Sequence, residues 1–154
     1  MIRQTLSPLT RSTNEEIAAD DAVHLIQQSI IPVDVAYLKS TESLKRSLRE
    51  IERIESDVVP KLSASSAHEL VKAIEVRSMA TVAKLMTIAS LTREESRGFH
   101  FRKEFPKTDN EKWLKWVMLH KDERGETEIR VENVPTPYLK PTEAYSDPPG
   151  TQKV

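Results

Sequence analysis

The sequence predicts a mainly α fold: a spectrin-repeat-like three-helix bundle, followed by a short β-hairpin and an extended proline-rich C-terminal tail. The first reason is composition, because 154 residues with only three glycines and 5% aromatic residues do not suit a turn-rich β fold. The second is periodicity, since apolar residues recur at three- and four-residue steps in three long segments. The third is a change to alternating residues after Pro106, which indicates strands.

Prolines and short polar residues mark both ends of the chain. Pro8 and several serines and threonines interrupt any periodicity near the start, so we expect residues 1–13 to form a flexible tail. We assign residues 14–110 to the bundle and residues 111–134 to the hairpin. Residues 135–154 contain five prolines and are expected to form an extended tail.

The first helix is expected to begin at a capping box. Thr13 and Glu16 have the spacing at which the threonine hydroxyl accepts from the third amide of the helix and the glutamate accepts from the capping residue. Pro32 ends the helix, because proline lacks an amide donor and disfavours helix in the residue before it. The expected buried positions are Ala18, Ala22, Leu25, Ile26, Ser29 and Ile30.

The second helix is expected over residues 41–59, after a linker of sequence PVDVAYLKS. Charged residues occupy its outer side, and Pro60 closes it. Its apolar face consists of Leu44, Leu48, Ile51, Ile54 and Val58.

The third helix is the longest. Ser66 and Glu69 form another capping box at its start, and we expect it to run unbroken to Arg97. Gly98 would then end it, since glycine adopts the left-handed conformation at little cost. Its expected buried face consists of Val71, Ile74, Ser78, Val82, Leu85 and Ala89.

Two strands are expected at residues 116–121 and 126–134, with Gly125 at the positive-φ position of the loop between them. The second strand alternates apolar with polar residues, so we expect one of its faces to be exposed to solvent. The first strand is apolar on both faces from Trp116 to Leu119, which a two-stranded ribbon cannot bury by itself. Either the bundle covers one face and a partner covers the other, or this part is irregular.

Charge and cysteine content exclude several function classes. The formal net charge of −1 lacks the basic excess of a nucleic-acid-binding protein, so we expect no nucleic-acid partner. Without cysteine, the chain has no disulfides and no thiolate ligands for zinc or an iron–sulfur cluster. No segment approaches the ~18 apolar residues of a membrane helix, and residues 1–16 lack the apolar run of a secretory signal. We therefore expect no membrane insertion and a cytoplasmic location.

The chain also lacks the glycine-rich loops that hold nucleotides. Three isolated glycines cannot form the G-x-G-x-x-G turn with which a Rossmann fold binds a dinucleotide. We therefore predict no cofactor-binding, metal-binding or catalytic residues in this chain.

A charged run, REESRGFHFRKEFP over residues 93–106, is the most distinctive segment. Guanidinium groups, a carboxylate and an imidazole brought together at a helix end can hold a neighbouring domain through paired hydrogen bonds. The same residues can instead form only a structural helix stop, because cations favour helix C-termini. The residue types alone favour the structural reading.

This run resembles the Arg-x-Glu-Ser-Arg-Gly-x-His-x-Arg-x-Asp-x-Pro signature of the C-terminal domain of fumarate reductase and succinate dehydrogenase flavoproteins. The superfamily also includes L-aspartate oxidase and adenylylsulfate reductase. The resemblance is strong over residues 85–116 and general in the two preceding helices, and the segment 129–141 also looks like the ending of the family. The residues that carry it are Arg93, Glu95, Ser96, Arg97, Gly98, His100, Arg102, Pro106 and Asp109.

The match to the signature has three departures. Glu94 occupies a position that is often basic, Phe99 replaces a usually small residue, and Glu104 stands where aspartate is usual. The charge balance of the turn can therefore differ from that of the family.

The resemblance implies an accessory helical domain or small subunit of a flavoprotein oxidoreductase. In that family the FAD and the proton-transfer residues lie in other domains, so the chain would have no activity alone. FAD would belong to the parent enzyme or partner, and an iron–sulfur subunit is a further implied partner. The residues expected to dock onto the FAD-binding part are Arg93, Glu95, Ser96, Arg97, His100, Arg102, Asp109, Trp113 and Trp116.

Two other hypotheses stay open. One is a stand-alone adaptor whose helices bind another protein through the charged turn and the two-faced strand. The other is a small enzyme that uses His100 with Glu95 or Asp109, which the absence of a pocket-forming architecture makes the weakest reading. Of the four histidines only His100 is a serious candidate, and nearby cations are expected to keep it neutral.

Overall fold

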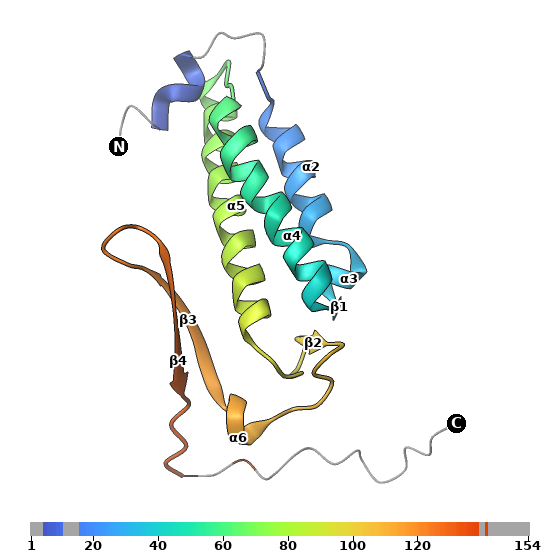
Figure 1. Ribbon diagram of the computed structural model, residues 1–154. Coiled ribbons are helices and arrows are strands. Elements are labelled where there is room, and N and C mark those ends of the chain that lie inside the picture. The colour runs from blue at the N-terminus through green and yellow to red at the C-terminus, as the bar shows by residue number, and fades with distance from the viewer. Residues whose placement is uncertain (1–4, 11–15, 139–140, 142–154) are drawn as a thin grey trace.

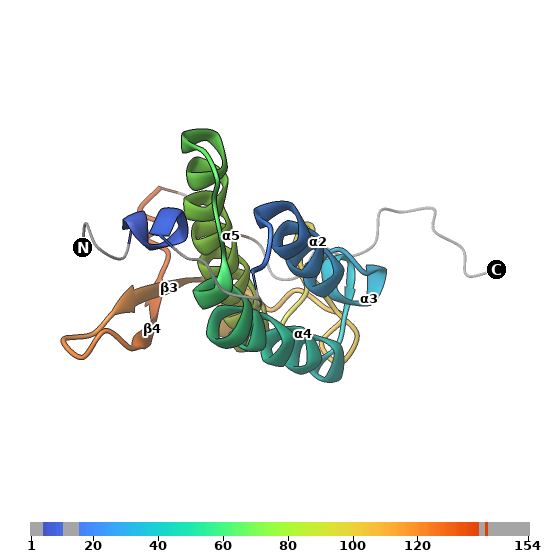
Figure 2. The ribbon, with the colours of Figure 1, turned by 90° about the horizontal axis from the view of Figure 1, so that it is seen from above.

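The computed structural model describes residues 5–10, 16–138 and 141. Three long helices form its main body: α2 (Ala19–Ile30), α4 (Thr41–Arg53) and α5 (Ala67–Thr92) (Figure 1). Seen from above, they occupy the corners of a triangle, and a β-hairpin stands on one side of α5 (Figure 2). The predictions of a mainly helical fold and of a hairpin are confirmed.

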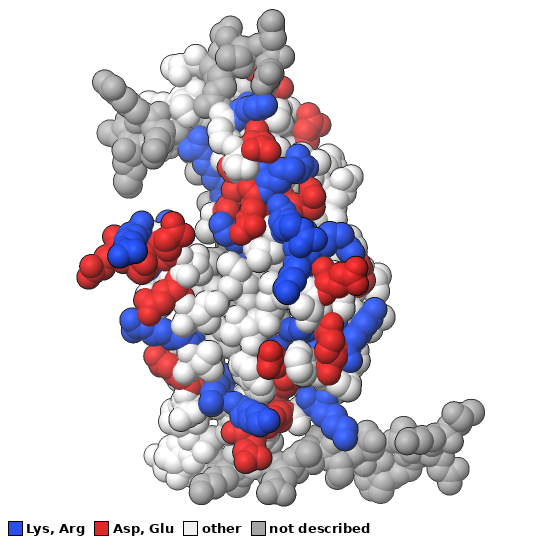
Figure 3. Space-filling view, in the orientation of Figure 1, with Lys and Arg blue, Asp and Glu red and all other residues white. Residues whose placement is uncertain are grey.

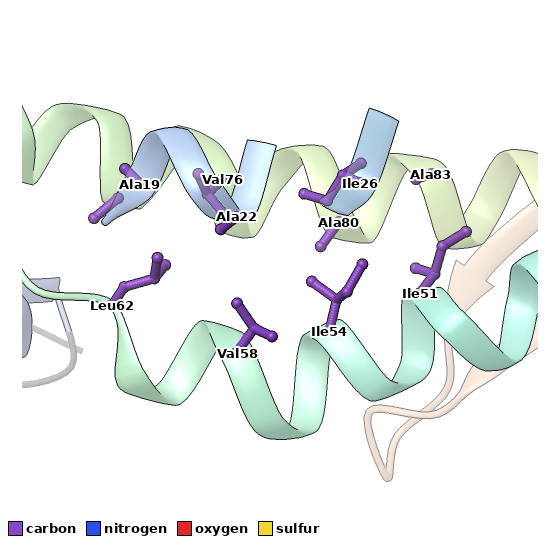
Figure 4. Packing of buried hydrophobic residues seen from close by; sticks show 11 residues of the cluster. Ala19, Ala22, Ile26, Ile51, Ile54, Val58, Leu62, Val76, Ala80 and Ala83 are labelled. Atoms are coloured by element: carbon purple, nitrogen blue, oxygen red, sulfur yellow. The ribbon is translucent and has the colours of Figure 1, made fainter. Parts of the chain in front are cut away.

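One cluster of buried apolar residues lies between the three helices (Figure 4). The helix α5 contributes mostly alanines, which allow helix backbones to approach closely, while α4 and the turn after it contribute larger side chains. Burying each isoleucine or valine contributes about 1.5–3 kcal/mol. The cluster consists of Ala19, Ala22, Ile26, Ile51, Ile54, Val58, Leu62, Ala73, Val76, Ala80 and Ala83.

The buried face of α5 differs from the expected one. The expected face included Val71, Ile74 and Val82, which are exposed in the structure. The buried residues of α5 are Ala73, Val76, Ala80, Ala83 and Thr87, on the opposite side of the helix. The helix is apolar on two faces, so periodicity alone does not distinguish them, and the face with small residues packs because it permits the closest contact.

A matched pair of substitutions tests this assignment. Val76 is 0% exposed, whereas Val82 on the same helix is 53% exposed. We expect Val76→Ala to lower the free energy of unfolding by about 2 kcal/mol, from lost apolar burial and the cavity left behind. We expect Val82→Ala to change it by less than about 0.5 kcal/mol. Urea unfolding followed by circular dichroism measures both, and equal losses would contradict the assigned core.

The start of α2 also differs from the prediction. Thr13 of the expected capping box lies outside the described residues. The helix begins only at Ala19, because Ile17 pairs with the chain after α4: its amide donates to the Lys61 carbonyl at 3.1 Å, and its carbonyl accepts from the Ser63 amide at 3.1 Å. These tertiary hydrogen bonds compete with the first turn of a helix.

Residues 5–10, assigned above to a flexible tail, adopt a folded conformation. Ser7–Thr10 form a 3₁₀ turn, η1, in which Pro8 is buried. The Pro8 carbonyl accepts from the Ala64 amide at 3.0 Å, and the Arg77 guanidinium donates to the Ser7 hydroxyl at 3.4 Å. This segment therefore packs near the start of α5.

The helix α4 begins at Thr41, as predicted, with Ser40 as its cap. Its regular part ends at Arg53, and the chain continues through a π-helical turn, η2 (Ile54–Val58), and a 3₁₀ turn, η3 (Val59–Lys61). Pro60 lies inside η3 rather than ending the helix. The predicted apolar face is nevertheless largely correct, since Leu44, Ile51, Ile54 and Val58 are buried.

The expected linker between the first two helices contains structure that joins it to the charged run. A single helical turn, α3 (Val33–Ala36), precedes a short strand, β1 (Leu38–Lys39). This strand pairs in parallel with β2 (Phe101–Arg102), with Lys39 opposite Arg102. The Lys39 carbonyl also accepts from the Lys103 amide at 2.8 Å.

The hairpin follows a short helix, α6 (Asn110–Trp113). Its strands are β3 (Lys115–Lys121) and β4 (Thr127–Asn133), which pair antiparallel, and Gly125 has the predicted positive φ of +83°. The Asp122 side chain stabilises the loop by accepting from two backbone amides. Most of the expected proline-rich tail, residues 139–140 and 142–154, lies outside the described residues.

Candidate functional site

The charged run forms a folded turn beside the end of α5. The helix stops at Thr92, and the backbone of Arg93 is already extended. The prediction that α5 runs to Arg97 is therefore wrong. Gly98 has a φ of +57°, but it serves a tight turn in which the backbones of Arg97 and His100 exchange two hydrogen bonds of 2.8 and 3.0 Å.

Glu95 is the buried centre of the turn. Its side chain is fully buried and accepts from the Arg97 guanidinium at 2.8 and 3.0 Å through both carboxylate oxygens. The Asp109 amide donates to the same carboxylate at 2.9 Å, and Arg93 donates to it as well. These bonds hold the start of the turn against its end, fourteen residues later.

The charge of Glu95 is maintained by these donors. Burial opposes ionisation, but hydrogen bonds from Arg97, from the Asp109 amide and from Arg93 outweigh it and hold the pKa of Glu95 below its usual value. Both carboxylate oxygens have donors nearby, which is the condition under which a buried carboxylate is tolerated.

Arg102 caps the C-terminus of α5. Its side chain is almost completely buried, and one guanidinium nitrogen donates to the carbonyls of Ser90, Leu91 and Arg93 at 2.8, 3.3 and 3.2 Å. The other terminal nitrogen donates to the Thr41 hydroxyl at 2.7 Å. The Arg102 guanidinium thus supplies donors to carbonyls at the end of α5 that lack partners within the helix, and it also reaches the start of α4.

Glu104 makes the reciprocal contact at the start of α4. Its carboxylate accepts from the Thr41 amide at 2.7 Å and lies 3.5 Å from the Arg102 guanidinium. The amide hydrogen bond and the Arg102 charge lower the pKa of Glu104. A glutamate in place of the usual aspartate therefore still fits the turn, as an acceptor at a helix N-terminus.

Ser96 holds the middle of the turn together. Its hydroxyl donates to the Phe105 carbonyl at 2.7 Å and accepts from the Arg102 amide at 2.9 Å. Its backbone carbonyl accepts from the Thr108 hydroxyl at 2.7 Å. The small buried hydroxyl is therefore a structural connector, and no base lies among its hydrogen-bond partners in the described part of the chain to activate it as a nucleophile.

Arg93 connects the turn to the hairpin. Its guanidinium donates to the Trp113 carbonyl at 3.0 Å and to the Lys115 carbonyl, and its centre lies 5.6 Å from the centroid of the Trp113 ring. Asp109 caps α6 by accepting from the Lys112 amide at 2.8 Å. These two residues fix the point at which β3 leaves the turn.

The hairpin itself leaves apolar side chains uncovered. Trp116 is half exposed, and Met118, Ile129 and Val131 are exposed as well. Both faces of the ribbon carry such residues. Ile129 and Val131 lie on one face, opposite Leu119 and Val117, and Trp116 and Met118 lie on the other face. Figure 3 shows further uncharged surface between the hairpin and α4.

His100 is half-buried where the turn meets α5. Its Nε2 lies 3.2 Å from the Arg93 carbonyl. Burial lowers the pKa of His100, the charges of Lys39, Arg102 and Arg93 lower it further, and the Arg93 carbonyl only partly offsets them. The predicted direction is confirmed, although burial and Lys39, which is distant in sequence, contribute besides the neighbouring cations.

This lowered pKa predicts a pH dependence. A histidine whose pKa lies below 6.5 only in the folded state takes up a proton more readily on unfolding, so stability falls as pH drops below about 6.5. We expect His100→Gln to flatten this part of the profile of unfolding free energy against pH. The exposed His24 provides the control, His24→Gln, which should keep the slope of the unchanged protein. Identical slopes for all three proteins would contradict the prediction.

Two apolar grooves adjoin the turn. One of about 500 Å³ lies between α3, α5 and the tip of the turn, and includes Tyr37, Lys39, Met86, Phe99 and His100 in its lining. A second, of about 360 Å³, lies between the end of α5 and β3 and includes Trp116 and His100. Among the described residues, neither groove is lined by a carboxylate.

The structure places the predicted docking residues in two groups. Glu95, Ser96 and Arg102 are buried and bond within the chain. Trp116 and His100 reach the grooves. The sequence did not predict roles for Lys39 and Thr41, because their hydrogen bonds with Phe99 and Arg102 join residues about sixty positions apart. The unusual phenylalanine at position 99 was, by contrast, a visible signal of exposed surface.

Neither a membrane-spanning helix nor a metal-ligand cluster is found in the described part of the chain. None of its helices combines the length and apolarity that crossing a membrane requires. Among the same residues, no group of three histidine, aspartate or glutamate side chains is arranged to hold a metal ion.

The sequence matches a known family over most of its length. The family described as fumarate reductase flavoprotein C-term matches residues 26–146. An uncharacterized FAD-dependent oxidoreductase of Methanocaldococcus jannaschii is 35% identical over 77 residues, 50% of this chain and 14% of that protein. A fumarate reductase (CoM/CoB) chain of Methanothermobacter marburgensis is 34% identical over 92 residues, 57% of this chain and 16% of that protein. The matched region thus spans about one seventh to one sixth of the length of these relatives.

Solved structures share the fold. A quinol–fumarate reductase solved with menaquinol molecules superposes with a TM-score of 0.78 at 16% identity, over 92% of this chain and 25% of that chain. At this level of identity the agreement shows a shared fold over nearly the whole chain.

Proposed function

Because this chain belongs to the family of C-terminal domains of fumarate reductase flavoproteins, we propose that it docks onto the FAD-bearing part of such a flavoprotein and stabilises it. The chain has no catalytic role of its own in this proposal. Its three packed helices act as a bundle that supports the charged turn and the hairpin, which face the partner.

The observation that carries the proposal is the uncovered apolar surface of the hairpin. The strand β3 contacts α5, yet apolar side chains on both faces of the ribbon remain exposed, so we propose that a second body covers them. The side chains concerned are Trp116, Met118, Ile129 and Val131. The charged turn fixes the base of this ribbon through Arg93, so the surface is presented on a rigid support.

The docking role of the turn residues is divided between contact and positioning. Glu95, Ser96 and Arg102 have their polar groups bonded within the chain, so we propose that they hold the turn in shape. His100, Trp113, Trp116 and the outer edge of Arg97 are then the residues that meet the partner. Asp109 contributes through its cap on α6.

The parent reaction follows from the family names and stays a proposal. Relatives include an FAD-dependent oxidoreductase and a fumarate reductase, so FAD in the partner and a dicarboxylate substrate are the chemistry we propose. We also propose that electrons pass to or from an iron–sulfur partner. This chain has no cysteine with which to hold a cluster, so the cluster would belong to that partner.

The test is co-purification from the source cells. We expect the tagged chain to retain a protein that gives the visible absorption bands of flavin and that mass spectrometry identifies as a flavoprotein of this family. Trp116→Lys should reduce the recovered flavin about tenfold, since it places a charge in a buried apolar contact. Glu123→Lys, which adds the same side chain at the hairpin tip, serves as the control.

A colourless eluate would contradict the proposal. If the chain instead retains an unrelated protein through the same surfaces, the hypothesis of a stand-alone adaptor replaces the flavoprotein proposal. The Trp116→Lys variant would then recover less of that unrelated protein.

A further inference from the structure

A second uncovered apolar surface lies where α2, α3 and α5 meet. The larger groove described above is lined by several side chains that a monomer would normally bury: Tyr37 is 60% exposed, Met86 63% and Phe99 92%. Phe99 stands at the tip of a tight turn whose backbone bonds are complete without it. The fold therefore does not require an aromatic residue there.

This groove continues along the helices. An adjoining groove of about 300 Å³ is lined by residues of α2 and α5, and it shares Ile30, Ala83 and Met86 with the larger one. We call the continuous surface the α2–α5 strip. Figure 2 shows α2 and α5 next to each other, with the hairpin on another side of α5, so the hairpin does not cover the strip. Contiguous apolar surface of this kind marks an interaction site.

The end of the strip is positively charged. Lys39 and His100 are the ionisable groups of its described lining besides the Tyr37 phenol, and no carboxylate is among them. The Lys39 ammonium donates to the carbonyls of Ala36 and Phe99 at 2.7 and 3.5 Å. Burial and the charge of Arg102 lower the pKa of Lys39, and an anion beside the ammonium would offset both effects and favour its charged form.

We propose that the α2–α5 strip receives an apolar segment of the FAD-bearing part of the flavoprotein, and that this segment places a carboxylate beside Lys39. The inference rests on the proposed function and adds a second contact surface with its own chemistry. An apolar side chain enters between Tyr37, Met86 and Phe99, and the acidic group pairs with the ammonium at the rim.

A second copy of this chain fits the strip less well. A twofold contact through the same surface would place the Lys39 ammonium groups of both copies at one interface, where like charges repel. Within the described residues, the strip offers no acidic side chain of its own to compensate. Charge complementarity therefore selects a partner whose contacting segment is acidic and apolar.

Two substitutions and two controls test the inference in the co-purified complex. Met86→Arg puts a charge into the apolar part, and Lys39→Glu reverses the charge at the rim. Each should lower the recovered flavoprotein about tenfold, which corresponds to about 1.4 kcal/mol. Thr81→Arg, on an exposed position of the same helix outside the groove linings, and Lys45→Glu, on exposed α4, should leave recovery unchanged. Unfolding midpoints of all four variants show that loss of recovery is not loss of fold.

Hydroxyl-radical labelling gives an independent readout that needs no substitution. We expect oxidation of Tyr37, Met86 and Phe99 to fall in the complex relative to the isolated chain. If the unchanged chain recovers no flavoprotein, the proposed function fails and this inference with it. If recovery is normal in both strip variants and labelling is unchanged, the inference alone fails. Protection that appears in the isolated chain as its concentration rises would assign the strip to a second copy and overturn the inference.

Discussion

Glu95→Gln is expected to destabilise the protein by about 3 kcal/mol. The substitution keeps the shape of the side chain but removes the charge that pairs with Arg93 and Arg97. It also turns one acceptor into an amide donor, which then faces guanidinium donors in a fully buried site. Breaking one partner of a buried ion pair typically costs about 3–5 kcal/mol, and the amide oxygen retains part of the bonding. Urea unfolding at neutral pH measures the loss.

The neighbouring residue supplies the control. Glu94 is exposed, so Glu94→Gln should change the free energy of unfolding by less than about 0.5 kcal/mol. Comparable losses for the two variants would show that net charge, rather than the buried network, determines the effect.

The same network predicts a dependence on acidity. Since the pKa of Glu95 is lowered in the folded state, its contribution is fully present above the unfolded value of about 4.5 and is lost as pH falls through the folded pKa. The difference in unfolding free energy between the unchanged protein and Glu95→Gln should therefore shrink below pH 4.5. A difference that stays constant on acidification would contradict the assigned role of the charge.

Arg102→Met is expected to destabilise by about 3–5 kcal/mol, the largest effect of any single change considered. It removes the donors that satisfy three carbonyls at the end of α5 and the hydroxyl of Thr41, and the Arg102 side chain that supplies them is almost completely buried. Unpaired buried acceptors are costly, and the helix C-terminus also loses a favourable charge. Hydrogen exchange should show the last turn of α5 opening more often than its middle.

Two further variants separate charge from geometry. Arg102→Lys keeps the charge, but a single ammonium cannot reach both helix ends, so an intermediate loss of about 2 kcal/mol is expected. Lys103→Met removes a charge at the next, exposed position and should be nearly neutral. An Arg102→Lys protein as stable as the unchanged one would show that the fork geometry is not needed.

Local signals predicted the fold where neighbours in sequence decide the structure. Ser66 caps α5 as expected, with its hydroxyl accepting from the Glu69 amide at 3.3 Å. The Glu69 carboxylate returns to the Ser65 amide, at 2.6 Å, rather than to that of Ser66, so the capping box is displaced by one residue. Likewise the hairpin loop has its glycine at the predicted position.

Long-range contacts decided the features that the sequence did not predict. The start of α2 is set by pairing of Ile17 with residues after α4, and the end of α5 by Arg102, ten residues beyond the last residue of the helix. The buried face of α5 depended on which of two apolar sides meets the other helices. The charged run at residues 93–106 was recognisable in the sequence. Which of its charged side chains are buried depends on the folded turn, so the sequence did not predict it.

The central claim is that this chain is the docking partner of an FAD-bearing protein. Sedimentation velocity of the co-purified material, recorded at the flavin band and at the peptide band together, tests it most directly. We predict one boundary that carries both signals and is heavier than the 17.6 kDa chain. Flavin absorption that sediments in a separate boundary from this chain would contradict the claim.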